Sequence, residues 1–211
     1  MSNIKAAITA VGAFAPEYRL TNAILETMVD TNDEWIISRT GIKERRILKD
    51  ADKGTSYLAI QAAKDLIKSS NLDPSTIDLV LVATITPDMP VASTSAFVAS
   101  EIGAVNAFSY DLMAACSGFL FGMSTATSYI ESGRYKKVLL IGADKMSSII
   151  NYEDRATCII FGDGAGAVLF ESNSEDYGFE DEILLSDGIG RNFLKIDAGG
   201  SLLPASHETV D

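Results

Sequence analysis

The amino-acid sequence predicts a layered α/β domain, in which helices cover both faces of a parallel or mixed sheet. Two observations carry this prediction. Short runs of branched residues are apolar at successive positions, which is typical of strands buried on both faces. Between several of these runs, apolar residues recur at helical spacing. The predicted strands occupy residues 4–11, 79–84, 137–142, 157–161 and 167–170.

Helices are predicted over residues 55–69, 93–102 and 117–132. The first carries Leu58, Ala62 and Leu66 along one face, and the sequence NLDP at 71–74 ends it. The third ends at Gly133, a residue typical of a helix C-terminus. Because almost all of its residues are small or apolar, we expect this third helix to be buried on all sides.

A glycine-rich run, GDGAGA at residues 162–167, formally fits the dinucleotide-binding pattern G-x-G-x-x-A. The residues that follow, VLFE at 168–171, read as a strand, whereas phosphate binding needs a helix N-terminus there. We therefore reject a nucleotide fingerprint. The run is better explained as a tight turn between two strands, or as a place where the backbone passes close to another segment.

The charge balance limits the classes of partner. The 211 residues include 29 acidic and 17 basic side chains, and the net charge is −12. Binding to nucleic acid or to an anionic membrane needs a basic surface, so neither is expected. The densest basic stretch, KERRILK at 43–49, reads as a solvated edge. We also expect no signal peptide, because the apolar run near the N-terminus is short and has no convincing cleavage segment before Pro16. No membrane span is expected either, since no stretch reaches about 20 apolar residues.

The two cysteines, Cys116 and Cys158, are too few and too far apart to form a disulfide framework or a metal site. A reducing cytoplasm is therefore the expected setting, with no metal bound. Cys158 lies within ATCIIF, an apolar run with no helix start beside it, and is predicted to be a core residue.

Cys116 has different surroundings, MAACSGFLFG at residues 113–122. A helix that begins there would present unpaired N–H groups and its positive dipole end, and both favour a nucleophilic thiolate. The small neighbours leave room for a substrate, as in a nucleophile elbow. Unpaired cysteines are also among the most buried residues, so the local sequence leaves the nucleophile and core interpretations both open.

Four stretches occur in an order that is typical of one family, and they cover nearly the whole chain. They are TNDEWIISRTGIKERRI at 31–47, DLMAACSGF at 111–119, IGAD at 141–144 and NYEDRATCIIFGDGAGA at 151–167. With them the chain resembles the N-terminal part of β-ketoacyl-acyl-carrier-protein synthase III, a condensing enzyme that starts type II fatty acid synthesis. The resemblance implies a thiolase-like layered α/β/α fold and a homodimer.

The resemblance also implies that Cys116 is the nucleophile that takes an acyl group from acyl-CoA. The carbanion formed when malonyl-acyl carrier protein loses carbon dioxide would then attack the thioester, with a neutral His and Asn stabilising the developing charge. No cofactor is implied, because the coenzyme A thioester is a substrate. The glycine run at 162–167 would be a turn beneath the nucleophile helix.

By the same resemblance, Trp35 and Arg155 sandwich the adenine of coenzyme A, Thr31 touches the base and Arg39 lies near the phosphates. Indole and guanidinium groups are good stacking surfaces, and arginine pairs well with phosphate. Without the resemblance, the favoured interpretation of these residues would be a core tryptophan and surface arginines.

One position departs from the family in TPDMPVAST at 86–94. Relatives often carry an aromatic residue where Val91 stands, and in the family dimer that residue reaches into the acyl pocket of the partner. The smaller Val91 would enlarge the primer pocket, and Met89 nearby could compensate. Both residues are therefore expected to belong to an acyl pocket.

The family is longer than this chain, and its catalytic His and Asn lie in its second half. The only histidine here, His207, lies in PASHET without the context of the family motif, so no role is transferred to it. We expect residues 1–172 to form the N-terminal condensing domain and residues 173–211 a connecting segment and the start of a C-terminal domain. Two alternatives stay open: a non-catalytic truncated fragment, and a related condensing enzyme of secondary metabolism.

Overall fold

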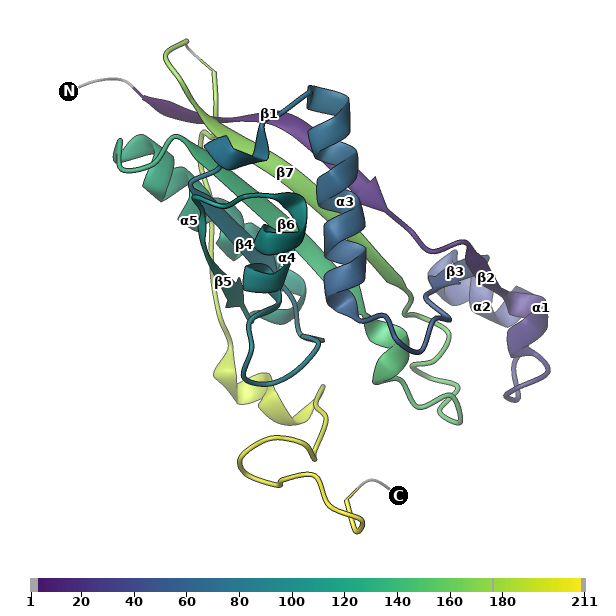
Figure 1. Cartoon of the computed structure of the whole chain (residues 1–211). Coiled ribbons are helices and arrows are strands. Elements are labelled where there is room, and N and C mark those ends of the chain that lie inside the picture. Colours follow the sequence, from purple (N-terminus) through teal and green to yellow (C-terminus); the bar gives the residue numbers. More distant parts are fainter. Residues whose placement is uncertain (1–3, 176, 210–211) are drawn as a thin grey trace. The chain divides into compact units, whose positions relative to one another are not determined.

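The computed structural model describes residues 4–175 and 177–209 (Figure 1). The chain divides into two compact units, Met1–Glu180 and Asp181–Asp211. The first unit contains every strand of the described chain and all of its α-helices, so it holds the sites that the sequence predicts.

A five-stranded mixed sheet forms the centre of the first unit, with the strand order β1-β7-β6-β4-β5 (Figure 1). Strand β4 pairs in parallel with β5 on one side and β6 on the other, whereas β7 runs antiparallel to both β6 and β1. The strands are β1 (Lys5–Phe14), β4 (Leu79–Ala83), β5 (Phe108–Leu112), β6 (Lys137–Lys145) and β7 (Asp163–Asn173). A separate antiparallel hairpin consists of β2 (Tyr18–Thr21) and β3 (Glu44–Ile47).

The helices connect these strands. The α-helices are α1 (Asn22–Leu25), α2 (Asp33–Thr40), α3 (Thr55–Ser70), α4 (Thr94–Ile102) and α5 (Gly118–Glu131). Short 3-10 helices are η1 (Pro74–Thr76), η2 (Ala115–Ser117), η3 (Met146–Ser148) and η4 (Gly188–Asn192). The three helices that the sequence predicts are confirmed as α3, α4 and α5, each with bounds within one residue of the expected ones at both ends.

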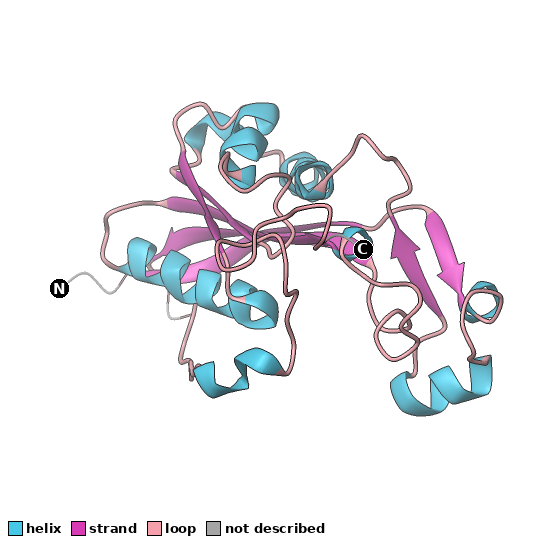
Figure 2. Ribbon diagram, turned by 90° about the horizontal axis from the view of Figure 1, so that it is seen from below, coloured by secondary structure: helices cyan, strands magenta, loops and turns pink. Residues whose placement is uncertain are grey.

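Alternating side chains of the central strands build two cores, one on each face of the sheet. On β4, Val80 and Val82 pack with residues of α3 and α4, whereas Leu79 and Leu81 pack with residues of α5. Figure 2 shows the resulting layers, with helices above and below the strands. Because every residue of β4 is buried, the prediction of a strand covered on both faces is confirmed there.

Capping residues, some of which the sequence analysis identified, define the ends of the helices. The side chain of Ser93 accepts a hydrogen bond from Ala96 N at the start of α4. Asn71 ends α3 in the left-handed conformation, with φ 53°, which agrees with the predicted break at NLDP. Gly133, with φ 72°, follows the C-cap of α5.

The helix α5 differs from the expectation that it is buried on all sides. Gly122, Ala126 and Ile130 face the sheet, but Leu120 is 56% exposed. A Cβ atom on Gly122 would lie 2.5 Å from Leu140 Cδ1 of β6, so a larger residue here would require Leu140 or α5 to shift. Within the described chain, one face of α5 is therefore exposed to solvent, which its apolar composition did not predict.

The strand predicted at 157–161 is wrong, because these residues end a turn over 154–160, here called the Arg155 turn. The side chain of Asp154 accepts hydrogen bonds from Ala156 N at 2.9 Å and from Thr157 Oγ1 at 2.6 Å, which favours a turn over a strand. Cys158 and Ile159 are buried against the hairpin and its helices instead of in the sheet. The apolar run therefore reflects burial without strand pairing.

The glycine run is not a turn between two strands either, since residues 163–167 belong to β7 itself. Residues 168–171 also lie in β7, so the strand predicted after the run is confirmed. The expected close approach is found at Gly162, where a Cβ atom would lie 3.0 Å from the Arg46 carbonyl oxygen.

The basic stretch at 43–49 is not a solvated edge. It contains β3, in which Arg45 is only 3% exposed and Ile47 is buried. The charge pattern predicted exposure wrongly, because the Arg45 guanidinium group donates to Ile159 O and Asn22 Oδ1 in the interior.

The second unit carries only the 3-10 helix η4 among its described residues, and His207 lies in a turn. Large apolar side chains such as Ile189 and Phe193 are exposed. In the described part of the chain, no helix combines the length and the apolar character needed to cross a membrane.

Candidate active site

Cys116 lies at the junction between β5 and α5, in the 3-10 turn η2 immediately before the first residue of α5, and its residue is exposed. The preceding residue, Ala115, has φ 46°, a left-handed conformation that is unfavourable for an L-residue with a side chain. Strained backbone of this kind is concentrated at functional sites. The strand, the sharp turn and the helix follow one another as the sequence suggested, in the order found in a nucleophile elbow.

An open hollow of about 310 Å³ surrounds Cys116. Three strands meet in it, because the ends of β4 and β6 and the beginning of β7 all contribute. Most of the lining is small, so the sulfur atom is accessible to an extended substrate. The lining residues are Ala83, Ala115, Cys116, Phe119, Gly142, Ala143, Asp144, Met146, Gly162 and Gly164.

Asp111 fixes the strand that leads to Cys116. Its Oδ2 atom accepts a hydrogen bond from Thr94 N at 2.7 Å, and its Oδ1 atom accepts one from Ser95 N at 2.7 Å. These N–H groups belong to the first turn of α4, where a negative charge is stabilised by the helix dipole. The carboxylate thus anchors the end of β5 to α4.

Asp144 lines the hollow, but its hydrogen bonds are structural. Its Oδ1 atom accepts from Thr84 Oγ1 at 2.9 Å, from Ile85 N at 2.9 Å, and from Thr86 N at 3.2 Å and Oγ1 at 2.8 Å. All four of these donors belong to residues 84–86. Asp144 therefore fixes the loop that leaves β4 at the mouth of the hollow.

Cys158 contrasts with Cys116, and its predicted core position is confirmed. It is fully buried together with Leu20, Leu25 and Ile36. Burial raises the pKa of the Cys158 thiol, and the nearby Asp154 raises it further. A protonated and inaccessible thiol cannot act as a nucleophile.

A second group of predicted residues meets around Trp35 on α2, and we call Thr31, Trp35, Arg39 and Arg155 the Trp35 cluster. Arg39 Cζ lies 4.4 Å from the centre of the indole ring, and Arg155 Cζ lies 5.0 Å from it. Arg155 Nη1 also donates to the Asp30 carbonyl oxygen at 2.9 Å, beside Thr31. Both distances lie in the range of cation–π interactions.

Local capping explains how Trp35 and Arg39 share one side of α2. The side chain of Asn32 accepts from Trp35 N at 2.8 Å and begins the helix, and residues four apart then lie above one another. The hydroxyl of Thr31 is buried and has no hydrogen-bond partner in the described structure. An unsatisfied buried hydroxyl of this kind could bind a polar atom of a ligand.

The spacing within the Trp35 cluster leaves no room for a base. A ring between the indole and a guanidinium group needs about 7 Å, two van der Waals contacts of about 3.5 Å each. Arg155 Cζ lies only 5.0 Å from the centre of the indole ring, so Arg155 would have to move before an adenine could lie between the two groups.

Met89 and Val91 lie on the loop between β4 and α4, and they are 54% and 97% exposed. Neither is among the residues that line the Cys116 hollow. The loop itself is fixed, because Asp88 Oδ1 accepts a hydrogen bond from Ser56 N at 2.9 Å. The described chain therefore holds both side chains in solvent on a braced loop.

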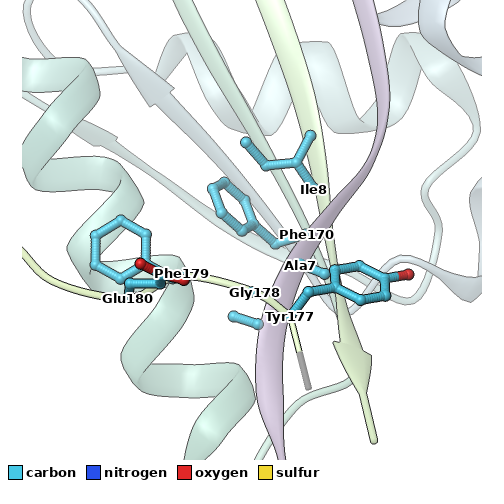
Figure 3. A pocket seen from close by; sticks show the side chains of 8 residues that line it. Ala7, Ile8, Phe170, Tyr177, Gly178, Phe179 and Glu180 are labelled. Carbon is cyan, nitrogen blue, oxygen red and sulfur yellow. The ribbon is translucent and has the colours of Figure 1, made fainter. Parts of the chain in front are cut away.

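Another hollow, of about 330 Å³, lies where residues 177–180 cross β1 (Figure 3). Phe179 N donates to the Ala6 carbonyl oxygen at 2.8 Å, which holds the crossing segment against the strand. Ile8, Phe170 and Phe179 supply much of the lining, and no lining residue is shared with the Cys116 hollow. This hollow is separate from the nucleophile.

Sequence reasoning missed Asp111, Asp144 and Arg45 as residues that shape the two sites. Asp111 directly precedes LMAAC, and Asp144 ends the stretch IGAD, so both stood within stretches that carry the resemblance. Their contacts join segments that are distant in sequence, and only the folded chain reveals them. Among the described residues, no group of three or more His, Cys, Asp or Glu side chains could hold a metal ion.

Comparison with known proteins identifies relatives over the whole chain. The family model for 3-oxoacyl-[acyl-carrier-protein (ACP)] synthase III matches residues 110–188. A β-ketoacyl-[acyl-carrier-protein] synthase III of Phocaeicola vulgatus is 54% identical over 211 residues, which are 100% of this chain and 63% of the relative. One of Chlorobium chlorochromatii is 57% identical over 210 residues, 99% of this chain and 64% of the relative. The chain thus spans somewhat less than two thirds of the length of these relatives.

Solved structures agree. A synthase III of Thermus thermophilus is 44% identical, with a TM-score of 0.84, over 87% of this chain and 57% of that one. One of Aquifex aeolicus is 45% identical, with a TM-score of 0.78, over 81% and 55%. The thiolase-like α/β fold expected from the resemblance is therefore correct. Over its whole length this chain is therefore similar to an N-terminal part of 3-oxoacyl-[acyl-carrier-protein] synthase III proteins.

Proposed function

We propose that the protein is a condensing acyltransferase that starts type II fatty acid biosynthesis, with Cys116 as its nucleophile. One observation carries the proposal. In a chain of the synthase III family, an exposed cysteine follows a strained residue and directly precedes a helix, in a hollow lined by small residues. A core cysteine needs none of these features.

In the proposed first step, the Cys116 thiolate attacks the carbonyl carbon of acyl-CoA. The carbon–sulfur bond to coenzyme A breaks, the coenzyme leaves as a thiolate that takes a proton, and the acyl group remains on Cys116 as a thioester. In the second step, malonyl-acyl carrier protein loses carbon dioxide, and its carbanion attacks this thioester to give 3-oxoacyl-acyl carrier protein. Cys116 then leaves as a thiolate and is regenerated.

The proposed binding site for coenzyme A is the Trp35 cluster. Trp35 and Arg155 would stack on the two faces of the adenine, Thr31 would contact the base, and Arg39 would lie near the phosphates. The ring contacts and the unsatisfied hydroxyl of Thr31 support this assignment. Arg155 would first leave its position over the indole, at the cost of an exposed hydrogen bond to Asp30.

The proposed partners are malonyl-acyl carrier protein and a second copy of the chain. In the described sheet, β5 is an edge strand that pairs only with β4, and such an edge can pair with another chain. Val91, on its braced loop, and Met89 would then reach the acyl pocket of the partner. The two free cysteines suit a reducing cytoplasm. Residues 173–211 are proposed to lead from the condensing domain towards the second half of the fold.

Intact-mass analysis after incubation with acetyl-CoA tests the acylation step. We expect one acetyl adduct on the protein, an unchanged adduct on the Cys158→Ala variant, and none on the Cys116→Ala variant. Cys158→Ala is the matched control, because it removes the other thiol. An acetyl adduct that persists in Cys116→Ala would refute the assignment of the nucleophile.

A related condensing enzyme of secondary metabolism is the second candidate. The structure of a priming β-ketosynthase from a polyketide biosynthetic pathway is 34% identical, with a TM-score of 0.78, over 81% of this chain and 51% of that one. Comparing acetyl-CoA with longer and branched acyl-CoA primers separates the candidates. A strong preference for a primer that fatty acid synthesis does not use would favour the second one.

A further inference from the structure

The side chain of Arg45 is unusual because it is both charged and buried. It projects from β3 and is only 3% exposed. Among the described residues, none of the ion pairs includes it. A buried guanidinium group without a carboxylate partner is costly, so its hydrogen bonds must be well made. Packing alone therefore does not account for a charged side chain at this position.

The hydrogen bonds of Arg45 join two segments that are far apart in the sequence. Its Nε atom donates to the Ile159 carbonyl oxygen at 2.7 Å, and Nη2 donates to the same oxygen. Its Nη1 atom donates to Asn22 Oδ1 at 2.5 Å. The Nδ2 atom of Asn22, which is itself buried, donates to Asp33 Oδ1 at 2.7 Å. A continuous chain of hydrogen bonds therefore runs from the Arg155 turn to the first residue of α2.

Both ends of this chain carry residues of the Trp35 cluster. Asp33 begins α2, which presents Trp35, and Ile159 closes the turn that presents Arg155. On the exposed side, Arg155 contacts the Trp35 ring and donates a hydrogen bond to the Asp30 carbonyl oxygen, and a base entering the cluster would disturb both. Arg45 holds the same two segments from the buried side, where a ligand does not reach.

We propose that Arg45 is a positioning residue for the nucleotide end of coenzyme A, because it fixes the separation of the backbones that carry Trp35 and Arg155. The inference rests on the proposed function, in which these two side chains clamp the adenine. The Arg155 side chain can swing away from the indole while its backbone stays in place. The adenine then meets two prearranged surfaces, which lowers the entropic cost of binding.

The geometry needs an arginine. Its planar group donates to one carbonyl oxygen through two nitrogen atoms and to an amide oxygen through a third. A lysine keeps the charge but has one nitrogen atom on a flexible stem, so it cannot hold both segments in one fixed arrangement. Arg45→Lys is thus the informative conservative variant.

Trp35 makes a direct test possible, since it is the only tryptophan in the chain. The fluorescence of the protein is titrated with coenzyme A, and a Trp35→Phe variant identifies the signal of Trp35. We expect the Kd for coenzyme A to rise about tenfold in Arg45→Lys, the scale seen when a supporting group is misplaced. Arg19→Met is the matched control, because Arg19 is an exposed arginine of the same hairpin, and its Kd should not change.

Acylation of Cys116 gives a second measurement that a general folding defect would not mimic. In Arg45→Lys, the KM for acetyl-CoA should rise about tenfold while the rate at saturation is unchanged. Acetyl-pantetheine, which lacks the nucleotide, should acylate the variant and the unaltered protein equally. Loss of reaction with both substrates would overturn the proposal in favour of a purely structural role.

A second variant is needed in case Arg45→Lys does not fold. Asp33, at the exposed end of the hydrogen-bond chain, can be substituted without changing a buried side chain. Asn22 Nδ2 donates to Asp33 Oδ1 and to the Ile42 carbonyl oxygen, and Asp33→Ala removes the one of these two acceptors that lies on α2. Glu34→Ala removes the same charge from the same helical turn. We expect Asp33→Ala to weaken coenzyme A binding about threefold more than Glu34→Ala. Equal Kd values in Arg45→Lys, Asp33→Ala and the unaltered protein would overturn the inference but leave the proposed function intact. If coenzyme A leaves the fluorescence of the unaltered protein unchanged, the proposed binding site itself fails.

Discussion

The turn at Cys116 and the turn at Arg155 each place a cysteine beside a proposed substrate site, but they are built in opposite ways. Backbone and small residues surround Cys116, and carboxylates anchor the neighbouring segments. Charged side chains and one indole ring form the Trp35 cluster, and Cys158 lies fully buried beneath it. Under the proposed function, the reacting end of the site is formed in advance, whereas Arg155 at the nucleotide end has to move before an adenine can bind.

Thiol labelling should show the largest difference between the two turns. At pH 7.5, iodoacetamide should modify Cys116 at least about a hundredfold faster than Cys158, because Cys158 is buried and its thiol pKa is raised. Peptide mapping after timed labelling measures both rates. Equal rates in the native protein would show that the two turns do not differ in accessibility.

Asp111→Ala should weaken the anchored turn most strongly. The variant removes two charge-assisted hydrogen bonds at the start of α4, so the free energy of unfolding should fall by about 3 kcal/mol. Urea denaturation measures this loss. The exposed Asp52 provides the control, since Asp52→Ala should change stability by less than about 0.5 kcal/mol. A similar small loss in Asp111→Ala would mean that α4 does not depend on this carboxylate.

Trp35→Ala should affect the nucleotide end alone. Stacking of a base on an aromatic ring contributes about 1–3 kcal/mol, so the Kd for coenzyme A should rise about tenfold or more. Isothermal titration calorimetry measures this change. Acylation by acetyl-pantetheine should stay at its original rate. A comparable loss with this short thioester would mean that the two ends of the site are not independent.

Alkaline pH should have the smallest effect. Burial raises the pKa of Tyr110 to about 12 and also raises that of Cys158. Each group is held in its protonated form by folding, so its contribution is complete below the ordinary pKa and is lost as the pH rises through the raised one. Stability should therefore decline between about pH 9 and 12. Because Tyr110 is partly exposed, its share should be no more than about 1 kcal/mol. Urea midpoints measured across this range provide the check, and constant midpoints would contradict it.

The sequence predicted the layers well because helical spacing and capping residues are local signals. Helix α3 shows its apolar stripe and its Asn71 end directly, and β4 is a run of branched residues that the fold buries completely. The run at 157–161 failed as a strand because burial against the hairpin produces the same apolar pattern as burial in a sheet. Asp154, whose side chain forms the turn, stood outside the run.

The candidate site was predictable only where its signal is local or resembles a family. Small residues and a predicted helix start made Cys116 recognisable in the sequence. The left-handed conformation of Ala115 and the hydrogen bonds from α4 to Asp111 depend on tertiary structure and could not be predicted. Trp35 and Arg155 are far apart in the sequence, so only the resemblance brought them together. Arg45 was misread because a charged residue in a basic run usually faces solvent.

Gly122 gives the helix that follows Cys116 a further property. Its missing side chain lets α5 lie directly against Leu140 of β6, in the helix that begins two residues after Cys116. A methyl group at this position would force either the Leu140 side chain or α5 itself to shift, and neither Gly122 nor Leu140 lines the hollow. Packing at Gly122, six residues further along the chain, is thus part of the support for the proposed nucleophile.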